Sequence, residues 1–203
     1  MSTVTMWRFF LSFLLTAIWT DYGYAQAIVE RSEIEHFVQT ADGKPHFCGI
    51  DFTILFSDYV TSSNGRLATA RGSLSFKEQK GDLVLFLKVG GMDFASPGQP
   101  PTKFAVATAS LIAGGTTYFV ANQIPCEDKN MFCGIFWLPA SAEIYSKILS
   151  ERTVTLNFNR TTGSLDVQVP ISSVGSPQDA KNQLAFDACM GTILSQARAN
   201  NAR

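Results

Sequence analysis

Four cysteines and two histidines are the residues of this chain with the widest range of chemistry. Cys126 and Cys133 are separated by six residues, so a disulfide between them would close a small loop. Three pairings of four cysteines are possible, and this local one leaves Cys48 to join Cys189. The alternative is a metal site that uses His46 and Cys48, but zinc sites usually recruit pairs of cysteines with roughly two to four residues between them. The spacing therefore favours two structural disulfides, and we predict no metal ligands.

Catalysis by a nucleophile would need His36 or His46 beside a serine, a cysteine or a carboxylate. The sequence has no G-x-S-x-G motif. Carboxylates such as Asp51 and Asp58 are expected to be solvated groups near strand ends, with nothing to tie them into an acid–base pair. Residues 89–92 lack the spacing and the Lys-Ser/Thr ending of a phosphate-binding loop. We expect a non-enzymatic protein without a cofactor, and an enzyme with no recognisable motif is an alternative.

The loop between Cys126 and Cys133 is the candidate binding element. It places Met131 and Phe132 next to charged residues, of which Lys129 is one. A loop closed by a disulfide loses less conformational entropy on binding, so a short loop can contribute affinity. The alternative is that Met131 and Phe132 pack into the core, as apolar residues near strand ends usually do.

Residues 1–27 have the pattern of a signal peptide. One basic residue precedes an apolar run from Phe9 to Trp19, and the segment ends in Ala25-Gln26-Ala27. The run is about 11 residues long, which fits a signal peptide and is too short to span a bilayer. We expect cleavage to leave Ile28 or Gln26 at the amino terminus. An uncleaved anchor is the alternative.

Export and an even number of cysteines together predict a disulfide-bonded domain in an oxidising compartment, either the periplasm or the extracellular space. Of the 203 residues, about 176 follow the signal, which is enough for a single β-rich domain over 28–203. The formal net charge of −1 gives no indication of a nucleic-acid partner. No second apolar run reaches transmembrane length, so no stable membrane span is expected in the mature form.

Most of the chain has the composition and alternation of β-strands. We predict an antiparallel meander over 50–60, 66–76 and 83–89. The stretch from Gly90 and Gly91 to Pro101 is predicted to be a connection between two sheets, because it cannot form a central strand. Further strands are predicted over 103–107, 116–121, 134–138, 153–158 and 165–169.

Helices are predicted at three places. Residues 28–39 could form a short helix or a poorly ordered arm. A short helix is expected over 142–149. A longer helix should begin after Ser176, with Pro177 in its first turn and Cys189 in its apolar stripe. The predicted fold is mainly β: an antiparallel β-sandwich or partly open barrel with a short helix and a covering C-terminal helix.

The order of elements between 116 and 180 resembles a known family. A strand is followed by Cys126 and Cys133, a short helix, the strand over 153–158 and the segment Val169-Pro170-Ile171-Ser172. This order is similar to that of the invasion-associated locus B family of alphaproteobacterial exported proteins. The resemblance lies in the second half of the chain only, about a third of its length. It implies a small periplasmic or surface-associated protein linked to interaction with host cells.

The functional hypothesis is therefore an exported, non-enzymatic binding protein of the cell envelope with a protein partner there or on a host cell. The alternative is a carrier of small apolar ligands, which requires the strands to close into a barrel with an apolar interior.

Overall fold

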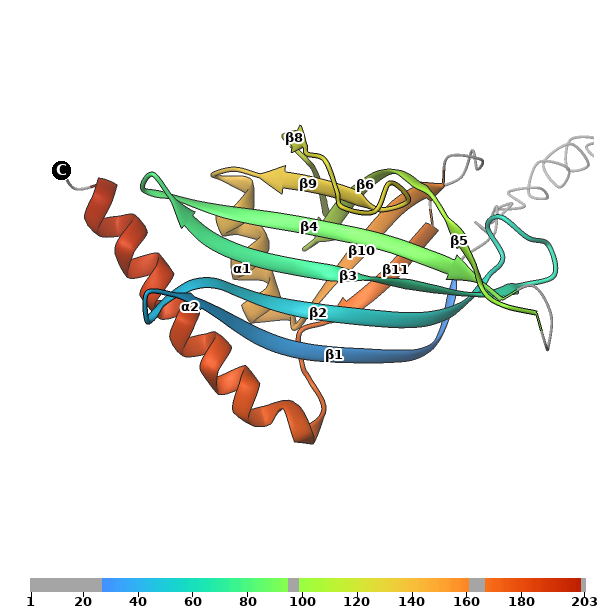
Figure 1. The fold of residues 1–203 in the computed structure, drawn as a ribbon, viewed down its shortest axis with the longest axis horizontal. Helices are drawn as coiled ribbons and strands as arrows, with labels where there is room; N and C mark the ends of the chain where they lie inside the picture. The colour runs from blue at the N-terminus through green and yellow to red at the C-terminus, as the bar shows by residue number, and fades with distance from the viewer. Residues whose placement is uncertain (1–26, 95–98, 161–166, 202–203) are drawn as a thin grey trace, which may run out of the picture.

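A computed structural model describes residues 27–94, 99–160 and 167–201, with side chains to residue 199. The described chain forms two antiparallel sheets with two α-helices (Figure 1). This confirms the predicted β-sandwich with a short helix and a C-terminal helix, and the sheets do not close into a barrel. The predicted signal peptide, apart from Ala27, lies outside the described residues.

The larger sheet has the strand order β1-β2-β3-β4-β9-β8, and β5 pairs with β4 beside this path. Four long strands form a meander in chain order, in which β3 pairs with β2 over residues 66–76 and with β4 over residues 68–79. The strands are β1 (Ile28–Ala41), β2 (Lys44–Asp58), β3 (Arg66–Gln79), β4 (Asp82–Asp93), β5 (Thr102–Phe104), β8 (Asn122–Gln123) and β9 (Phe132–Phe136).

The smaller sheet has the order β11-β10-β6-β7, and its strands run diagonally across those of the larger sheet in Figure 1. Its strands are β6 (Val106–Ala113), β7 (Thr116–Phe119), β10 (Thr153–Arg160) and β11 (Val167–Ser172). The helices are α1 (Ala140–Glu151) and α2 (Ala180–Asn201), and a short 3₁₀ turn, η1 (Pro177–Asp179), precedes α2. None of the described helices is both long and apolar enough to cross a membrane.

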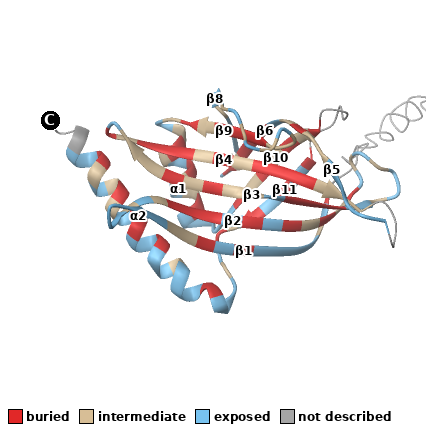
Figure 2. Cartoon of the chain, viewed as in Figure 1, coloured by how far each residue is buried: buried red, intermediate tan, exposed pale blue. Residues whose placement is uncertain are grey.

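The two helices and the smaller sheet all pack on one face of the larger sheet. Side chains on a strand alternate between faces, so the even-numbered residues of β2 from Cys48 to Phe56 share one face, and all of them are buried. Cys48 is bonded to α2, and the Phe56 ring lies 6.4 Å from Phe158 of β10. On β3, Phe76 of the same face contacts Tyr145 of α1 at 5.4 Å. Figure 2 shows the resulting alternation of buried and exposed residues, and β1 as the most exposed long strand.

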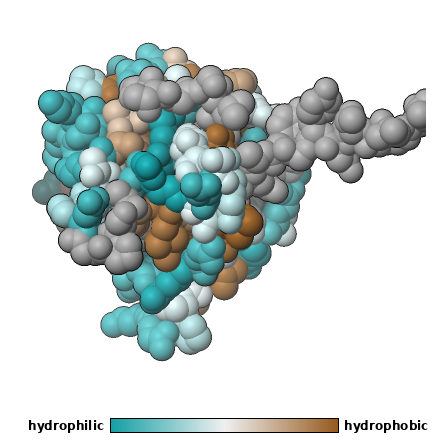
Figure 3. Space-filling model, turned by 90° about the vertical axis from the view of Figure 1, so that its right-hand side faces the viewer, coloured by the Kyte–Doolittle hydropathy of each residue, from teal (hydrophilic) through white to brown (hydrophobic). Residues whose placement is uncertain are grey.

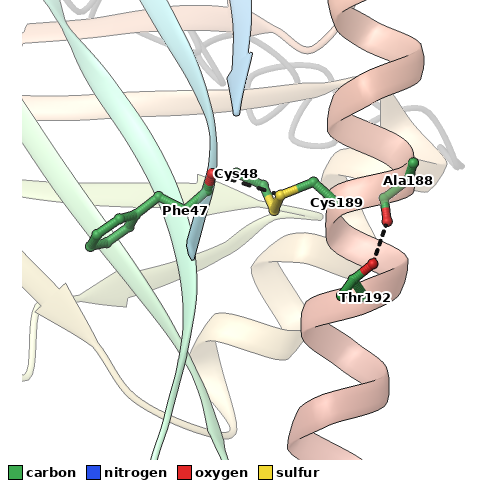
Figure 4. Close-up of a disulfide and its surroundings, with 5 residues drawn as sticks. All are labelled: Phe47, Cys48, Ala188, Cys189 and Thr192. Atoms are coloured by element: carbon green, nitrogen blue, oxygen red, sulfur yellow. Dashed lines mark hydrogen bonds between the residues drawn. A yellow bond between two sulfur atoms is a disulfide. The ribbon is translucent and has the colours of Figure 1, made fainter. Parts of the chain in front are cut away.

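The two predicted disulfides are present. Cys48–Cys189 joins β2 to α2 across 141 residues of sequence (Figure 4). Cys126–Cys133 closes the short loop that leads into β9. Cys189 lies in the buried stripe of α2, as the spacing predicts. Ser176 does not cap this helix with its side chain, and the chain instead enters α2 through η1.

A buried arginine joins the two sheets at the opposite end of β2. The Arg160 guanidinium lies 2.7 Å from the Asp58 carboxylate and 3.0 Å from that of Asp93, and it stacks over Phe104 at 3.8 Å. The Arg160 and Asp58 side chains are 6% and 0% exposed. The prediction that Asp58 is solvated is therefore wrong, because its charge is compensated inside the protein. This end of the molecule, seen in Figure 3, shows apolar patches among hydrophilic side chains.

Three stretches differ from the sequence predictions. Residues 28–41 form neither a helix nor an arm but the edge strand β1, because pairing along most of β2 outweighs a local capping pattern. Gly90 and Gly91 continue β4, which lies between β3 and β9, so they do occupy a central strand. A Cβ at either position would crowd the side chain that lies against it, which is Met131 or Phe104.

The third difference is β6, which the sequence predictions miss almost entirely. The predicted strand over 103–107 straddles β5 and β6, whereas β6 runs on to Ala113 and pairs with β10 in the smaller sheet. Three alanines over 106–113 give this strand a weak β-propensity, and its place between β7 and β10 compensates for that.

Replacing Arg160 by Met should cost about 3 kcal/mol or more of unfolding free energy, because Asp58 would stay buried without a compensating charge. Arg66 contacts the same Asp93 at 3.8 Å but is 50% exposed, so Arg66→Met is the matched control and should cost about 1 kcal/mol or less. Urea unfolding of both variants measures the difference. Equal losses of unfolding free energy in the two variants would mean that the buried contacts of Arg160 stabilise the protein no more than the exposed contact of Arg66 does.

Removing the long-range disulfide by Cys48→Ala/Cys189→Ala should destabilise the protein by about 4 to 5 kcal/mol in the chain-entropy account. The pair Cys126→Ala/Cys133→Ala is the control. It closes a loop across only seven residues of sequence, so its loss should be roughly half as large. Chemical unfolding under non-reducing conditions measures both, and a larger loss from the short loop would contradict this ranking.

Candidate binding site

The face of the larger sheet opposite the core is the candidate site. The helices and the smaller sheet pack on the other face, so odd-numbered positions of β2 and β3 and even-numbered positions of β4 point away from them. The strand register places these outward residues in rows across the sheet. One row is Glu35, Asp51, Ser73 and Lys88, and the next is Phe37, Gly49, Ser75 and Phe86.

These rows form the floor of an open groove, called here the open-face groove. Its first hollow has a volume of about 470 Å³ and its second about 350 Å³, and the two share Asp51, Ser73 and Lys88. A smaller hollow of about 60 Å³ continues it, sharing Arg71 and Met131 with the second. The first two volumes are in the range of small-molecule sites, but the hollows are shallow and open to solvent.

Aromatic side chains give the first hollow its apolar character. Phe37 lies over Gly49, where a Cβ would overlap its ring. Phe47 contacts Phe86 edge to face, with 5.7 Å between ring centroids, and the Lys77 ammonium lies 5.1 Å from the Phe47 ring. All three phenylalanines are half-buried. They are packed well enough to be held in place and exposed enough to contact a partner.

The segment before β9 borders the groove beside β4. Ile124 and Cys133 line the first hollow, and Met131 lies over Gly90 beside the second. An ion pair of 2.6 Å between Lys103 and Asp128 fastens this segment to β5. Hydrogen bonds from Lys103 and from the backbone of Asn130 hold the pKa of Asp128 below its usual range. Together with the Cys126–Cys133 disulfide, these contacts fix the border.

The three predicted binding residues lie in three different environments in the structure. Met131 lines the groove, Lys129 is exposed on the bordering segment, and Phe132 is 2% exposed in the core. Phe132 therefore follows the core alternative and cannot contact a partner. The phenylalanines of the groove were not predicted as site residues. For Phe37 and Phe86, a possible signal was their position on the solvent-facing side of their strands, opposite Gly49 and Ser75.

Charged groups of both signs lie on the open face. Glu35 and Asp51 are directly opposite each other on β1 and β2, and Lys88 is two strands further on in the same row. Partial burial raises the pKa of Asp51, the Glu35 charge adds to this, and Lys88 partly offsets it. Within the described chain, no ion pair joins Glu35, Asp51, Arg71 or Lys88 to another side chain.

Neither histidine lines the groove. His36 is 3% exposed and points into the core, where its Nδ1 contacts the Asp179 carboxylate and its ring lies 5.2 Å from Phe186. Burial would raise the pKa of Asp179, but hydrogen bonds from the His36 ring and backbone and from Asn182 lower it overall. The pair joins β1 to η1, directly before α2. His46 is exposed and packs edge to face on Phe47 at 4.8 Å.

No family model, curated protein or solved structure matches this chain.

The carboxyl of Asp51 should titrate above its ordinary pKa and that of Asp128 below it, which a carbon-detected NMR titration can resolve. Glu35→Gln should lower the pKa of Asp51, because it removes a neighbouring negative charge, and Lys88→Met should raise it, because it removes a positive one. Glu143→Gln on α1 is the control and should leave Asp51 unchanged. If Glu35→Gln does not shift Asp51, the two carboxylates do not interact as described.

Proposed function

We propose that this chain is an exported, non-enzymatic binding protein whose protein partner docks on the open-face groove. One observation carries the proposal: a face of a long sheet that the described elements leave uncovered holds half-buried aromatic side chains next to unpaired charges. A sheet face that only met solvent would be expected to present polar residues throughout. The aromatic side chains are held in place by glycine and ring contacts, so little entropy would be lost when a partner covers them.

The composition of the groove favours a protein partner over a small molecule. Aromatic residues, methionine and arginine are enriched in the centres of protein interfaces, and Phe86, Met131 and Arg71 supply all three. A small ligand would leave most of its surface in water, because the hollows are open. The carrier alternative requires a barrel interior, and the two separate sheets do not provide one.

Export is part of the proposal. The two disulfides are typical of a non-cytoplasmic protein, and the pattern of residues 1–27 is that of a signal peptide. We place the protein in the periplasm or outside the cell. The resemblance of the second half to the invasion-associated locus B family extends the proposal to a role in contact with host cells.

Site-directed photocrosslinking tests this function in the native envelope. A photoreactive phenylalanine analogue in place of Ser73, at the centre of the groove, should give discrete protein adducts on irradiation. The same analogue in place of Lys181, exposed on α2, is the control and should give none. Adding Phe86→Ser to the chain that carries the analogue at position 73 should abolish the adducts. Circular dichroism should show that this variant keeps its fold. Adducts that are equal at both positions, or that survive Phe86→Ser, would overturn the proposal.

A further inference from the structure

We propose that the partner on the open-face groove is a second copy of this chain, docked face to face about a twofold axis. This inference rests on the proposed function and names the partner of the same site. It follows from the way charge is divided across the face, since the two halves of the face complement each other.

The half of the face formed by β1 and β2 is acidic. Glu33, Glu35 and Asp51 point outward there, and the one basic neighbour, Arg31, is already paired with Glu33 at 2.7 Å. Asp51 is the group for which a nearby positive charge would matter most, because Glu35 faces it across the strands. This half offers unpaired negative charge to a partner.

The half formed by β3 and β4 is basic. Arg71, Lys77 and Lys88 point outward, and no acidic residue occupies an outward position over 69–77 or 84–92. The described chain gives Arg71 and Lys88 no ion-pair partner. When two copies of such a surface face each other about a twofold axis, the acidic half of each copy lies opposite the basic half of the other.

A twofold axis parallel to the strands, between β2 and β3, provides that turn. It places β1 opposite β4 of the partner copy and β2 opposite β3, at the same height along the strands. By the register, Glu35 then faces Lys88 of the second copy, and Asp51 faces Ser73, next to Arg71. Each contact occurs twice because the interface is isologous.

The same operation brings the aromatic residues together. Phe37 and Phe86 lie in one row, on β1 and β4, so the axis places Phe37 of each copy opposite Phe86 of the other. Sheets that pack face to face lie about 10 Å apart, a distance that these side chains can fill. The segment that borders β4 would then lie beyond the β1 edge of the partner copy, where no strand of the described chain obstructs it.

Charge reversal tests the arrangement on the chain expressed with its own amino-terminal segment and purified under oxidising conditions. Sedimentation equilibrium should show a dimer that weakens as salt is raised, because the contacts between charges are screened. Glu35→Lys and Lys88→Glu should each raise the dissociation constant by about a hundredfold or more, since each creates two like-charge contacts. The double variant Glu35→Lys/Lys88→Glu should restore the dimer.

An equimolar mixture of the two single variants should also dimerise, as a heterodimer. One chain then carries lysine at both positions 35 and 88 and the other carries glutamate at both, so every facing pair has opposite charges. Lys181→Glu is the matched control for a change of charge and should dimerise like the parent chain. A parent chain that stays monomeric at its highest soluble concentration would overturn the inference. So would single variants that dimerise like the parent, or a mixture that does not dimerise.

The two proposals fail separately. If sedimentation shows a monomer while the photoreactive group at Ser73 still gives adducts with another protein, the binding face stands and the partner is a different chain. If there is neither a dimer nor an adduct, both proposals fall. An adduct of twice the chain mass together with the charge-reversal pattern supports both.

Discussion

The architecture depends on how one long meander buries its side chains. Side chains on strands β1 to β4 alternate between the two faces of the sheet, and nearly all the fully buried apolar residues of these strands lie on a single face. Everything that shields this core must therefore pack on the same side, and α1, α2 and the smaller sheet do so. The price of a core on one side is an opposite face without a covering layer. The candidate site is a direct result of this asymmetry.

The covering layer is held to the meander by different interactions at the two ends of β2. Near the beginning of β2, Cys48 is covalently bonded to α2. At the end of β2, the buried Arg160 of the smaller sheet forms ion pairs with Asp58 and Asp93 of the larger sheet. Large aromatic side chains such as Phe56 and Phe158 fill the space between. The covalent bond acts mainly by restricting the unfolded chain, whereas the buried charge makes mispairing of the sheets costly.

Local patterns were enough to predict much of this fold. The β2–β4 hairpins, both disulfides and the C-terminal helix follow from alternation, loop spacing and an apolar stripe, which are properties of neighbouring residues. Three features depend on distant partners and could not be predicted in this way. The first is β1, which pairs with β2 although its sequence has a helix-capping pattern. The second is Gly90–Gly91, where the absence of a Cβ lets side chains from other segments pack closely on the strand. The third is β6, whose alanines form a strand only between two neighbouring strands. The groove was missed for the same reason, because its rows exist only once four strands are in register.

The contact between His36 and Asp179 has a consequence for assembly. β1 is the outermost strand of the larger sheet, and its backbone could in principle recruit a strand from another molecule without limit. The backbone N–H of His36 donates a hydrogen bond to both oxygens of the Asp179 carboxylate, each at 3.2 Å. The middle of the β1 edge is therefore already hydrogen-bonded and is not free to pair with another strand. Charged residues such as Glu33 and Glu35 follow along the same strand and discourage further strand addition. The outer edge of β1 is therefore protected against the addition of further strands, which is the route by which proteins with exposed strand edges aggregate.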